Sequence, residues 1–218
     1  ADLEFPHHTN EIAQSEAKTG KTFANYWMHN GFVNIDNVKM SKSLGNFITV
    51  HDALKTIDGQ VLRFFFATQH YRKPINFTEK AVRDAETNLK YLKNTYEQPF
   101  TGEVDSADLQ GFVDKFIAAM DEDINAANGI TVVFELAKWI NSGHYNQDVK
   151  DALTKMLEVF GVVFVEEVLD ADIEALIAER QEARAKKDFA RADAIRDELA
   201  AQGIKLLDTK EGVRWTRD

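Results

Sequence analysis

The sequence predicts a mainly α-helical protein with a short mixed α/β part at its N-terminal end and a small α+β module at its C-terminal end. Three observations predict this class. Apolar residues recur at helical spacing in four long segments between residues 79 and 166. Aromatic and β-branched residues gather at 26–35, as in a strand. Alternating segments at 204–207 and 213–216 flank a turn-rich stretch, which indicates a β-hairpin.

Length and composition are those of an ordinary globular protein. The chain has 218 residues, of which 44% are hydrophobic and 28% are charged. No apolar run approaches the roughly 20 residues that span a bilayer, and the first residues lack the pattern of a signal peptide. Cys is absent, so a cytoplasmic location is the default. The chain opens at Ala1, without Met, and we expect it to be part of a longer protein.

Charge is distributed unevenly. The net charge is −10, yet residues 180–218 hold 10 Lys and Arg against 8 Asp and Glu, which leaves 16 against 28 in the remainder. Nucleic-acid binders usually carry a basic excess somewhere. A contact with a polyanion is therefore expected at the C-terminal end and around residues 39–42.

The first elements are a helix and a strand. A helix is predicted from His7 to about Lys18, with Pro6 in its first turn and Gly20 at its end. The run at 26–35 predicts one buried strand or the arm of a short hairpin, and residues 36–37 mark a turn.

Two further helices follow the turn. Residues 49–52 have the capping-box pattern, which opens a helix through residue 55. Asp58-Gly59 ends or restarts it, and the strongly apolar segment 61–67 is expected to be buried. The stretch 70–74 then breaks the pattern.

Four amphipathic helices are predicted next. Thr78 is a good N-cap for the first, and residues 102–106 form a linker after it. Short connections between such helices are typical of an antiparallel bundle. The apolar stripes are interpreted as core rather than as a cofactor site.

The C-terminal module is predicted to hold two helices and a hairpin. Acidic residues at 166–172 suggest a boundary. One helix is expected from Ile173 to about Lys187 and another from Phe189 to Leu199, with Gly203 as its stop. The hairpin described above follows.

The stretch Lys39-Met40-Ser41-Lys42-Ser43, followed by Leu44-Gly45-Asn46, has the composition of a phosphate-binding loop. Backbone N–H groups, hydroxyls and ammonium groups can all point at one polyphosphate. Fixed cations stabilise the charge that builds on the α-phosphate of ATP and on departing pyrophosphate. Judged by composition alone, such a stretch is more often a solvated turn.

His7 and Glu11 stand four residues apart on the predicted first helix. This spacing places both side chains on one face, one turn apart, where they can ligate Zn²⁺. A surface His–Glu pair is the simpler interpretation, because a complete structural zinc site needs four ligands.

Taken together, several motifs resemble cysteinyl-tRNA synthetases, which are class I aminoacyl-tRNA synthetases. They are Phe5-Pro6-His7-His8-Thr9-Asn10-Glu11, Trp27-Met28-His29, residues 39–46 and His70-Tyr71-Arg72. The resemblance covers essentially the whole chain and matches the C-terminal half of a bacterial-type enzyme. It implies four regions. These are the remnant of a Rossmann-like catalytic domain (1–47), a connecting region (48–78), a helical bundle (79–166) and an anticodon-binding domain (170–218).

The resemblance also implies a function. The parent enzyme would form cysteinyl-adenylate from cysteine and ATP, with Mg²⁺, and would then esterify tRNA(Cys). Lys39 and Lys42 would be catalytic, the loop Lys39, Met40, Ser41, Lys42 and Ser43 would bind ATP, and His7 and Glu11 would be two of four zinc ligands, with His8 beside them. The family's other two ligands are cysteines, and these and its H-I-G-H-type nucleotide motif are absent from this sequence. We therefore expect the chain alone to be inactive and its zinc site incomplete.

Five residues match the family's anticodon-contacting surface: Arg184, Phe189, Asp193, Arg196 and Asp208. Single-stranded bases are read by stacking on aromatic or guanidinium planes and by hydrogen bonds to base edges. Trp215 is a second stacking candidate. Core packing is the alternative for both aromatic residues.

Two other functions fit parts of the sequence. A related ligase that joins cysteine to an amino-sugar would share the catalytic motifs but would need no anticodon reader. An RNA-binding fragment without catalysis is the second alternative. The expected partners are tRNA(Cys), cysteine and ATP, with no membrane, and the protein is expected to be a monomer.

Overall fold

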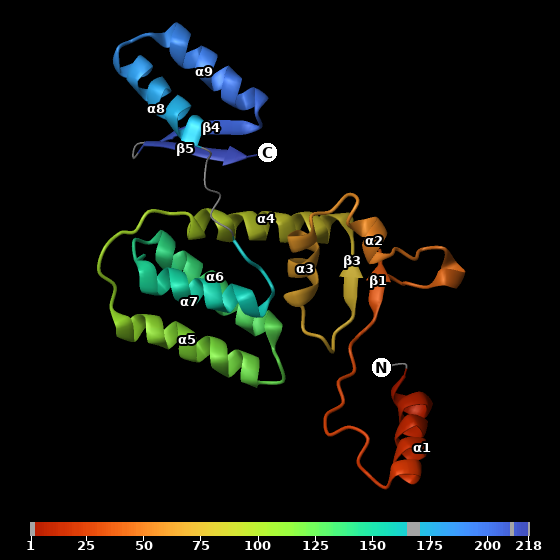
Figure 1. Ribbon diagram of the computed structural model, residues 1–218. Helices are drawn as coiled ribbons and strands as arrows, with labels where there is room; N and C mark the ends of the chain where they lie inside the picture. Colours follow the sequence, from red (N-terminus) through yellow and green to blue (C-terminus); the bar gives the residue numbers. More distant parts are fainter. Residues whose placement is uncertain (1–2, 165–170, 210–211, 218) are drawn as a thin grey trace. The chain divides into compact units, whose positions relative to one another are not determined.

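The computed structural model describes residues 3–164, 171–209 and 212–217. The chain divides into two compact units, Ala1–Phe164 and Val165–Asp218 (Figure 1). The fold is mainly α, as the sequence predicts. In the described ranges, strands form one three-stranded sheet in the first unit and one hairpin in the second. The predicted acidic boundary falls largely on residues 165–170, outside the described residues. No described helix is long and apolar enough to cross a membrane.

The first helix begins later than predicted. A wide turn, η1 (Glu4–His8), precedes the regular helix α1 (Thr9–Thr19), because Phe5 has an extended backbone. The peptide bond between Phe5 and Pro6 is cis. Gly20 ends α1 in the left-handed region, with φ 63°, as the sequence predicts. None of the residues of η1 and α1 is buried.

A three-stranded sheet follows, with strand order β2-β1-β3. β1 (Val33–Ile35) and β2 (Val38–Lys39) form the antiparallel hairpin that the sequence allowed, and residues 36–37 make its turn with positive φ. β3 (Ile75–Phe77), which was not predicted, pairs in parallel with β1. β1 is half-buried rather than buried.

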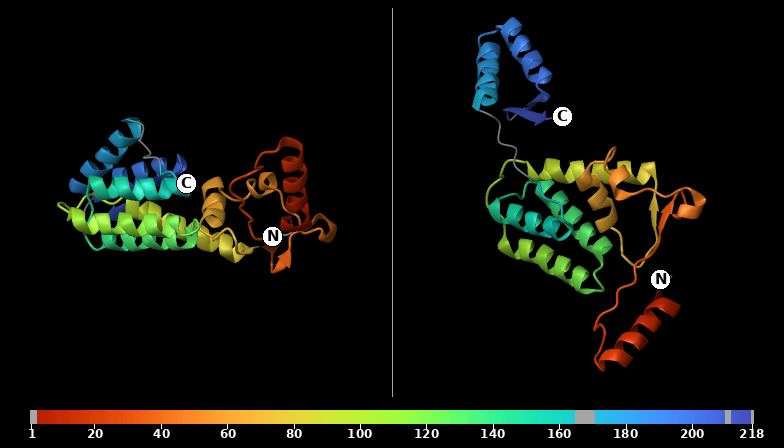
Figure 2. Two further views of the ribbon diagram at one scale, coloured as in Figure 1. Left: turned by 90° about the horizontal axis from the view of Figure 1, so that it is seen from below. Right: turned by 45° about the vertical axis from the view of Figure 1, so that its right-hand side comes forward.

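Two helices connect β1 to β3. Thr49 caps the one-turn helix α2 (Val50–Ala53), and Asp58 caps α3 (Gly59–Ala67) by accepting from the backbone of residues 60 and 61. The right-hand view of Figure 2 shows this crossover between the two strands. α3 is buried as predicted, since Phe64 and Phe65 retain under 5% exposure.

The helical bundle consists of α4 (Glu79–Tyr96), α5 (Ser106–Asp121), α6 (Ala126–Asn141) and α7 (Gln147–Val159). Each begins at a capping side chain, and Thr78 caps α4 as predicted. α6 packs against α4, α5 and α7, and α3 packs against α4. One apolar core therefore runs from the crossover through the bundle.

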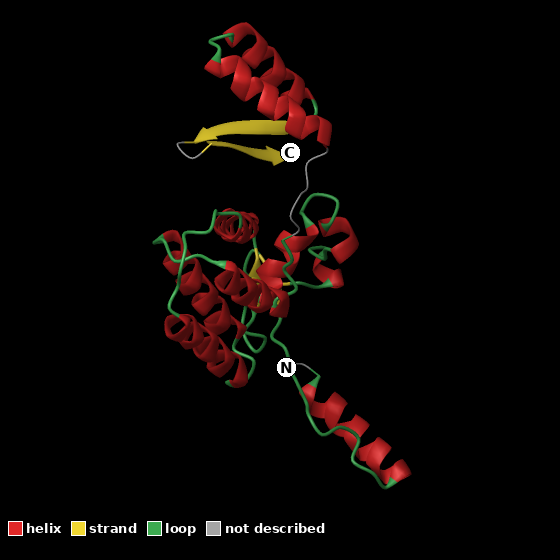
Figure 3. Ribbon diagram, turned by 60° about the vertical axis from the view of Figure 1, so that its left-hand side comes forward, coloured by secondary structure: helices red, strands yellow, loops and turns green. Residues whose placement is uncertain are grey.

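The second unit contains α8 (Ala171–Ala185), α9 (Phe189–Ala201), β4 (Ile204–Thr209) and β5 (Gly212–Arg217). Figure 3 shows the two helices side by side and the antiparallel hairpin next to them. Its core is separate and small, and is built on Ile173, Ile195, Leu199 and Ile204. Trp215 is half-buried against this core, so it serves packing.

Candidate functional site

The lysine loop, residues 39–46, is ordered by its own polar groups. Lys39 is the last residue of β2, and Met40 N–H donates to the Val33 carbonyl over 3.0 Å. A single 3₁₀ turn, η2 (Lys42–Leu44), follows and ends at Gly45 with φ 70°. Ser41 caps this turn, because its hydroxyl accepts from Leu44 N–H at 3.2 Å and lies 2.9 Å from the hydroxyl of Ser43.

One amide side chain closes the loop. Ser41 N–H donates to Asn46 Oδ1 over 2.9 Å, and Asn46 Nδ2 donates to the Lys39 carbonyl over 3.3 Å. Nothing in the residue pattern singles out Asn46 for a functional role, because asparagine is common in any turn. Its role becomes visible only when the two backbone partners are known.

Both ammonium groups of the loop lie over aromatic rings. Lys39 Nζ is 4.0 Å from the centroid of the Phe32 ring, and Lys42 Nζ is 5.5 Å from that of Phe47. Lys42 is exposed, and no carboxylate pairs with it in the described part of the chain. Its charge is therefore available for a phosphate.

A second cluster gathers imidazole and indole rings. His8 Nδ1 lies 2.9 Å from His29 Nε2, and the rings of His7 and Trp27 are 5.6 Å and 5.3 Å from that of His8. The segment after α1 runs back along the helix. The N–H group of Phe23, which follows the helix, donates to the side-chain carboxylate of Glu16 within it. The motif that contains Trp27 and His29 is thus brought to the histidines of η1.

The two predicted zinc ligands lie on consecutive elements, His7 in η1 and Glu11 in α1. His7 and Glu11 are both exposed, and among the described residues no ion pair joins them. Within residues 3–164, 171–209 and 212–217, no group of three or more His, Cys, Asp or Glu is arranged to hold a metal ion. The described residues therefore do not make a zinc site by themselves.

A charged cluster ties the connecting region to the bundle. Asp123 accepts from Arg72 Nε at 2.6 Å, from Arg72 Nη2 at 3.0 Å and from the Tyr71 hydroxyl at 2.7 Å, with His70 Nε2 3.9 Å away. Arg72, and after it Tyr71, lower the pKa of Asp123 from 3.8 to about 2. Asp123 and Ile124 have φ values of 57° and 53°, so this α5–α6 turn is strained.

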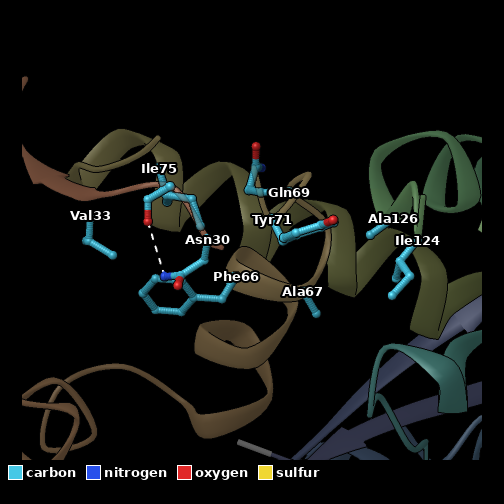
Figure 4. Close-up of a pocket in the computed structure, with 10 residues that line it drawn as sticks. Asn30, Val33, Phe66, Ala67, Gln69, Tyr71, Ile75, Ile124 and Ala126 are labelled. Carbon is cyan, nitrogen blue, oxygen red and sulfur yellow. Dashed lines mark hydrogen bonds between the residues drawn. The ribbon is translucent and has the colours of Figure 1, made fainter. Parts of the chain in front are cut away.

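A hollow of about 300 Å³ lies beside this cluster (Figure 4). Asn30, Phe66 and Ile124 contribute to its wall from three different segments. In Figure 4 the dashed line marks the hydrogen bond of 3.2 Å from Asn30 Nδ2 to the Gly31 carbonyl. None of the predicted site residues lines the hollow, so it is distinct from the lysine loop.

The predicted anticodon-contacting residues lie mostly on the α8–α9 hairpin. Phe189 opens α9 and is 62% exposed, which rules out core packing for it. Asp193 and Arg196 follow at helical spacing on the same face, and Arg196 Nη1 lies 3.2 Å from Asp193 Oδ1. Arg184 lies in the last turn of α8. Asp208 lies in β4, opposite Val213.

Comparison with known proteins assigns these regions to one family. Residues 1–87 match the model of the class I (C) tRNA synthetase catalytic domain, residues 115–166 the DALR domain, and residues 166–215 the cysteinyl-tRNA ligase anticodon binding domain. Curated cysteine–tRNA ligases of Streptococcus pneumoniae serotype 4, Streptococcus mutans and Streptococcus agalactiae serotype III are 85%, 82% and 75% identical over all 218 residues.

The chain spans 49% of the length of each of these relatives. It corresponds to their C-terminal half. The match is continuous from the lysine loop through the bundle to the C-terminal module, in the order that the sequence motifs predict. The chain therefore belongs to the cysteine–tRNA ligase family.

Proposed function

We propose that the whole protein attaches cysteine to tRNA(Cys) at the expense of ATP, through cysteinyl-adenylate. The observation that carries this proposal is the 85% identity to a cysteine–tRNA ligase over every residue of the chain, including the lysine loop. We place this reaction in the cytoplasm, where protein synthesis takes place, and expect a monomer.

In this proposal the loop binds the phosphates of ATP, which carries Mg²⁺. The Lys42 ammonium moves from the Phe47 ring to the α-phosphate and the departing pyrophosphate, and Lys39 supports it. Such a charge stabilises the transition state more than the ground state. Met40, Ser41 and Ser43 supply backbone N–H groups and hydroxyls around the same phosphates.

His7 and Glu11 contribute two zinc ligands in the whole protein. When bound, zinc supplies a soft centre that favours the thiolate of cysteine over the hydroxyl of serine. The remaining donors have to come from outside this chain, because it has no Cys and no group of three donors among its described residues. We therefore expect no measurable aminoacylation by the chain alone, and charging above background would overturn that expectation.

The test of the loop is Lys42→Ala in the full-length protein. We expect pyrophosphate exchange to fall by about 10²–10³-fold, as when one transition-state donor is removed, while affinity for tRNA stays the same. Lys55→Ala is the matched control, because Lys55 is an exposed lysine outside the loop that pairs with Asp52. Unchanged exchange in Lys42→Ala would refute the assignment.

We further propose that this chain itself binds the anticodon of tRNA(Cys) through Arg184, Phe189, Asp193, Arg196 and Asp208. The exposed Phe189 face of α9 and the anticodon-binding match at 166–215 favour this function over an amino-sugar ligase. Stacking of one base is worth about 1–3 kcal/mol. Phe189→Ala should therefore weaken binding of tRNA(Cys) by at least about fivefold.

The control for this experiment is tRNA(Cys) with a substituted anticodon. The native chain should bind it more weakly than tRNA(Cys), and Phe189→Ala should reduce that difference. Equal affinity of the native chain for both RNAs would remove the anticodon-reading proposal.

A further inference from the structure

The lysine loop contains a residue that no family motif above assigned to a role. Asn46 is half-buried, and its amide makes two hydrogen bonds of opposite sense to the backbone at the start of the loop. Its oxygen accepts from Ser41 N–H and its nitrogen donates to the Lys39 carbonyl. One side chain thus closes a ring from residue 39 to residue 46.

This pair of bonds requires an amide. A carboxylate at position 46 would accept from Ser41 but could not donate to Lys39, and an alanine would do neither. Gly45, with φ 70°, reverses the chain so that the amide can reach back to Lys39. The position of the amide is therefore set by the chain reversal as well as by its own bonds.

The ring fixes the base of the turn that carries Lys42. Lys42 is the first residue of η2, and Ser41 caps this turn. The N–H group of the same Ser41 donates to the side chain of Asn46. If the Asn46 bonds were lost, the cap and the turn would move with the freed backbone. Lys42 Nζ would then be presented from a wider range of positions, because its only described partner is the exposed Phe47 ring.

We propose that Asn46 is a positioning residue for Lys42: its side-chain amide holds the loop backbone so that the ammonium is presented to the phosphates of ATP. This inference rests on the proposed role of the loop. The role of Asn46 differs from that of the lysines, because its side chain bonds to the loop backbone and not to ATP. These bonds are therefore present with or without nucleotide.

The first test measures amide exchange in the chain by NMR, without nucleotide. In Asn46→Ala, exchange of the Ser41 amide should accelerate about fivefold, as expected for loss of one hydrogen bond. In Asn46→Asp it should stay slow, because an acceptor remains. The Met40 amide, which donates to Val33, should be unchanged in both variants and reports whether the strands are intact.

Asn76→Ala is the matched control. Asn76 also makes two hydrogen bonds of opposite sense, to the backbone and side chain of Asn37, but at the hairpin turn rather than at the loop. It should leave the exchange of Ser41 unchanged. Equal exchange of Ser41 in the native chain and in Asn46→Ala would overturn the inference.

The second test measures pyrophosphate exchange in the full-length protein. A positioning residue should lower kcat about tenfold while changing the KM for ATP less than threefold, and Asn76→Ala should change neither. A normal rate for Asn46→Ala beside a strongly reduced rate for Lys42→Ala would refute the positioning role alone. Normal rates for both would refute the proposed role of the loop, and the amide-exchange result would then stand as a structural property only.

Discussion

Asp123 shows how one residue can hold two regions of the molecule together. Its carboxylate accepts two hydrogen bonds from the Arg72 guanidinium, in a bidentate arrangement, and one from the Tyr71 hydroxyl. These contacts lower the pKa of Asp123 from 3.8 to about 2. The folded state therefore favours the ionised form more than the unfolded state does. This stabilising contribution is complete above about pH 4 and is lost as the pH falls toward 2.

Asp123→Asn should lower the melting temperature at pH 7, because the amide loses the charge that Arg72 and Tyr71 contact. The gap between the native chain and the variant should narrow as the pH falls from 4 toward 2, and melting curves recorded over that range check this. Asp114→Asn is the control, since Asp114 is exposed on α5 and accepts a hydrogen bond from the neutral side chain of Gln110. A gap that does not change with pH would contradict the charge-based explanation.

Phe47 offers a second prediction for a single residue. If Lys42 rests over this ring, the ring current shifts the ε-protons of the lysine, and Phe47→Leu should abolish that shift in the NMR spectrum. An exposed cation–π contact is worth only about 0.5–1 kcal/mol, so the fold should be unaffected. Lys39, which lies over Phe32, serves as the internal control and should keep its shift.

The position of a residue on its helix was easier to predict than the residues it contacts. The shared face of Phe189, Asp193 and Arg196 follows from the helical period alone. The exposure of Phe189 does not, since core packing was its alternative until the structure placed the ring at the surface. The roles of Asn46 and Asp123 do not, because each contact joins positions whose approach depends on chain reversal or tertiary packing. Asp123 and its partner Arg72 are 51 residues apart in the sequence.

At the scale of elements, long helices were predictable and the short strand was not. The caps at Thr78 and Asp58 and the apolar stripes of α4–α7 mark helices independently of their surroundings. β3 has only three residues and forms because β1 lies parallel to it. Pro74, just before β3, predicts a break in regular structure when the sequence is considered alone. The strand that pairs with β3 lies 42 residues earlier, so no local sequence pattern predicts the pairing.

Gly31 tests how closely the two parallel strands are joined. A Cβ added there would overlap the backbone carbonyl of Lys73, which cannot move without disturbing the entry to β3. Gly31→Ala should therefore destabilise the protein by about 1–3 kcal/mol in urea unfolding. Gly111→Ala should do the opposite, by about 0.5–1 kcal/mol, because this glycine lies within α5 with open space around it. Equal stability of the two variants would refute the close approach.

At the scale of the whole molecule, apolar exposure is concentrated in one region. Twelve of the nineteen exposed large apolar side chains in the described residues lie at positions 3–54, and they include Tyr26 at 91% and Val50 at 66%. Large exposed apolar surfaces usually mark interaction sites. The Streptococcus pneumoniae relative is about twice as long as this chain, so we expect this surface to contact the other half of such a protein.

That expectation is tested by mixing the chain with the N-terminal half of the Streptococcus pneumoniae ligase, produced as a separate polypeptide. Sedimentation should show a one-to-one complex, and burial should shift the emission of Trp27 to shorter wavelength. Val50→Asp should weaken the complex at least about tenfold, because it buries an unpaired charge, and Asp is tolerated at the start of a helix such as α2. Val159→Asp, on the exposed end of α7, should not weaken it. Equal weakening by both substitutions would show that the apolar surface at 3–54 is not the contact, whereas a selective effect of Val50→Asp would identify it.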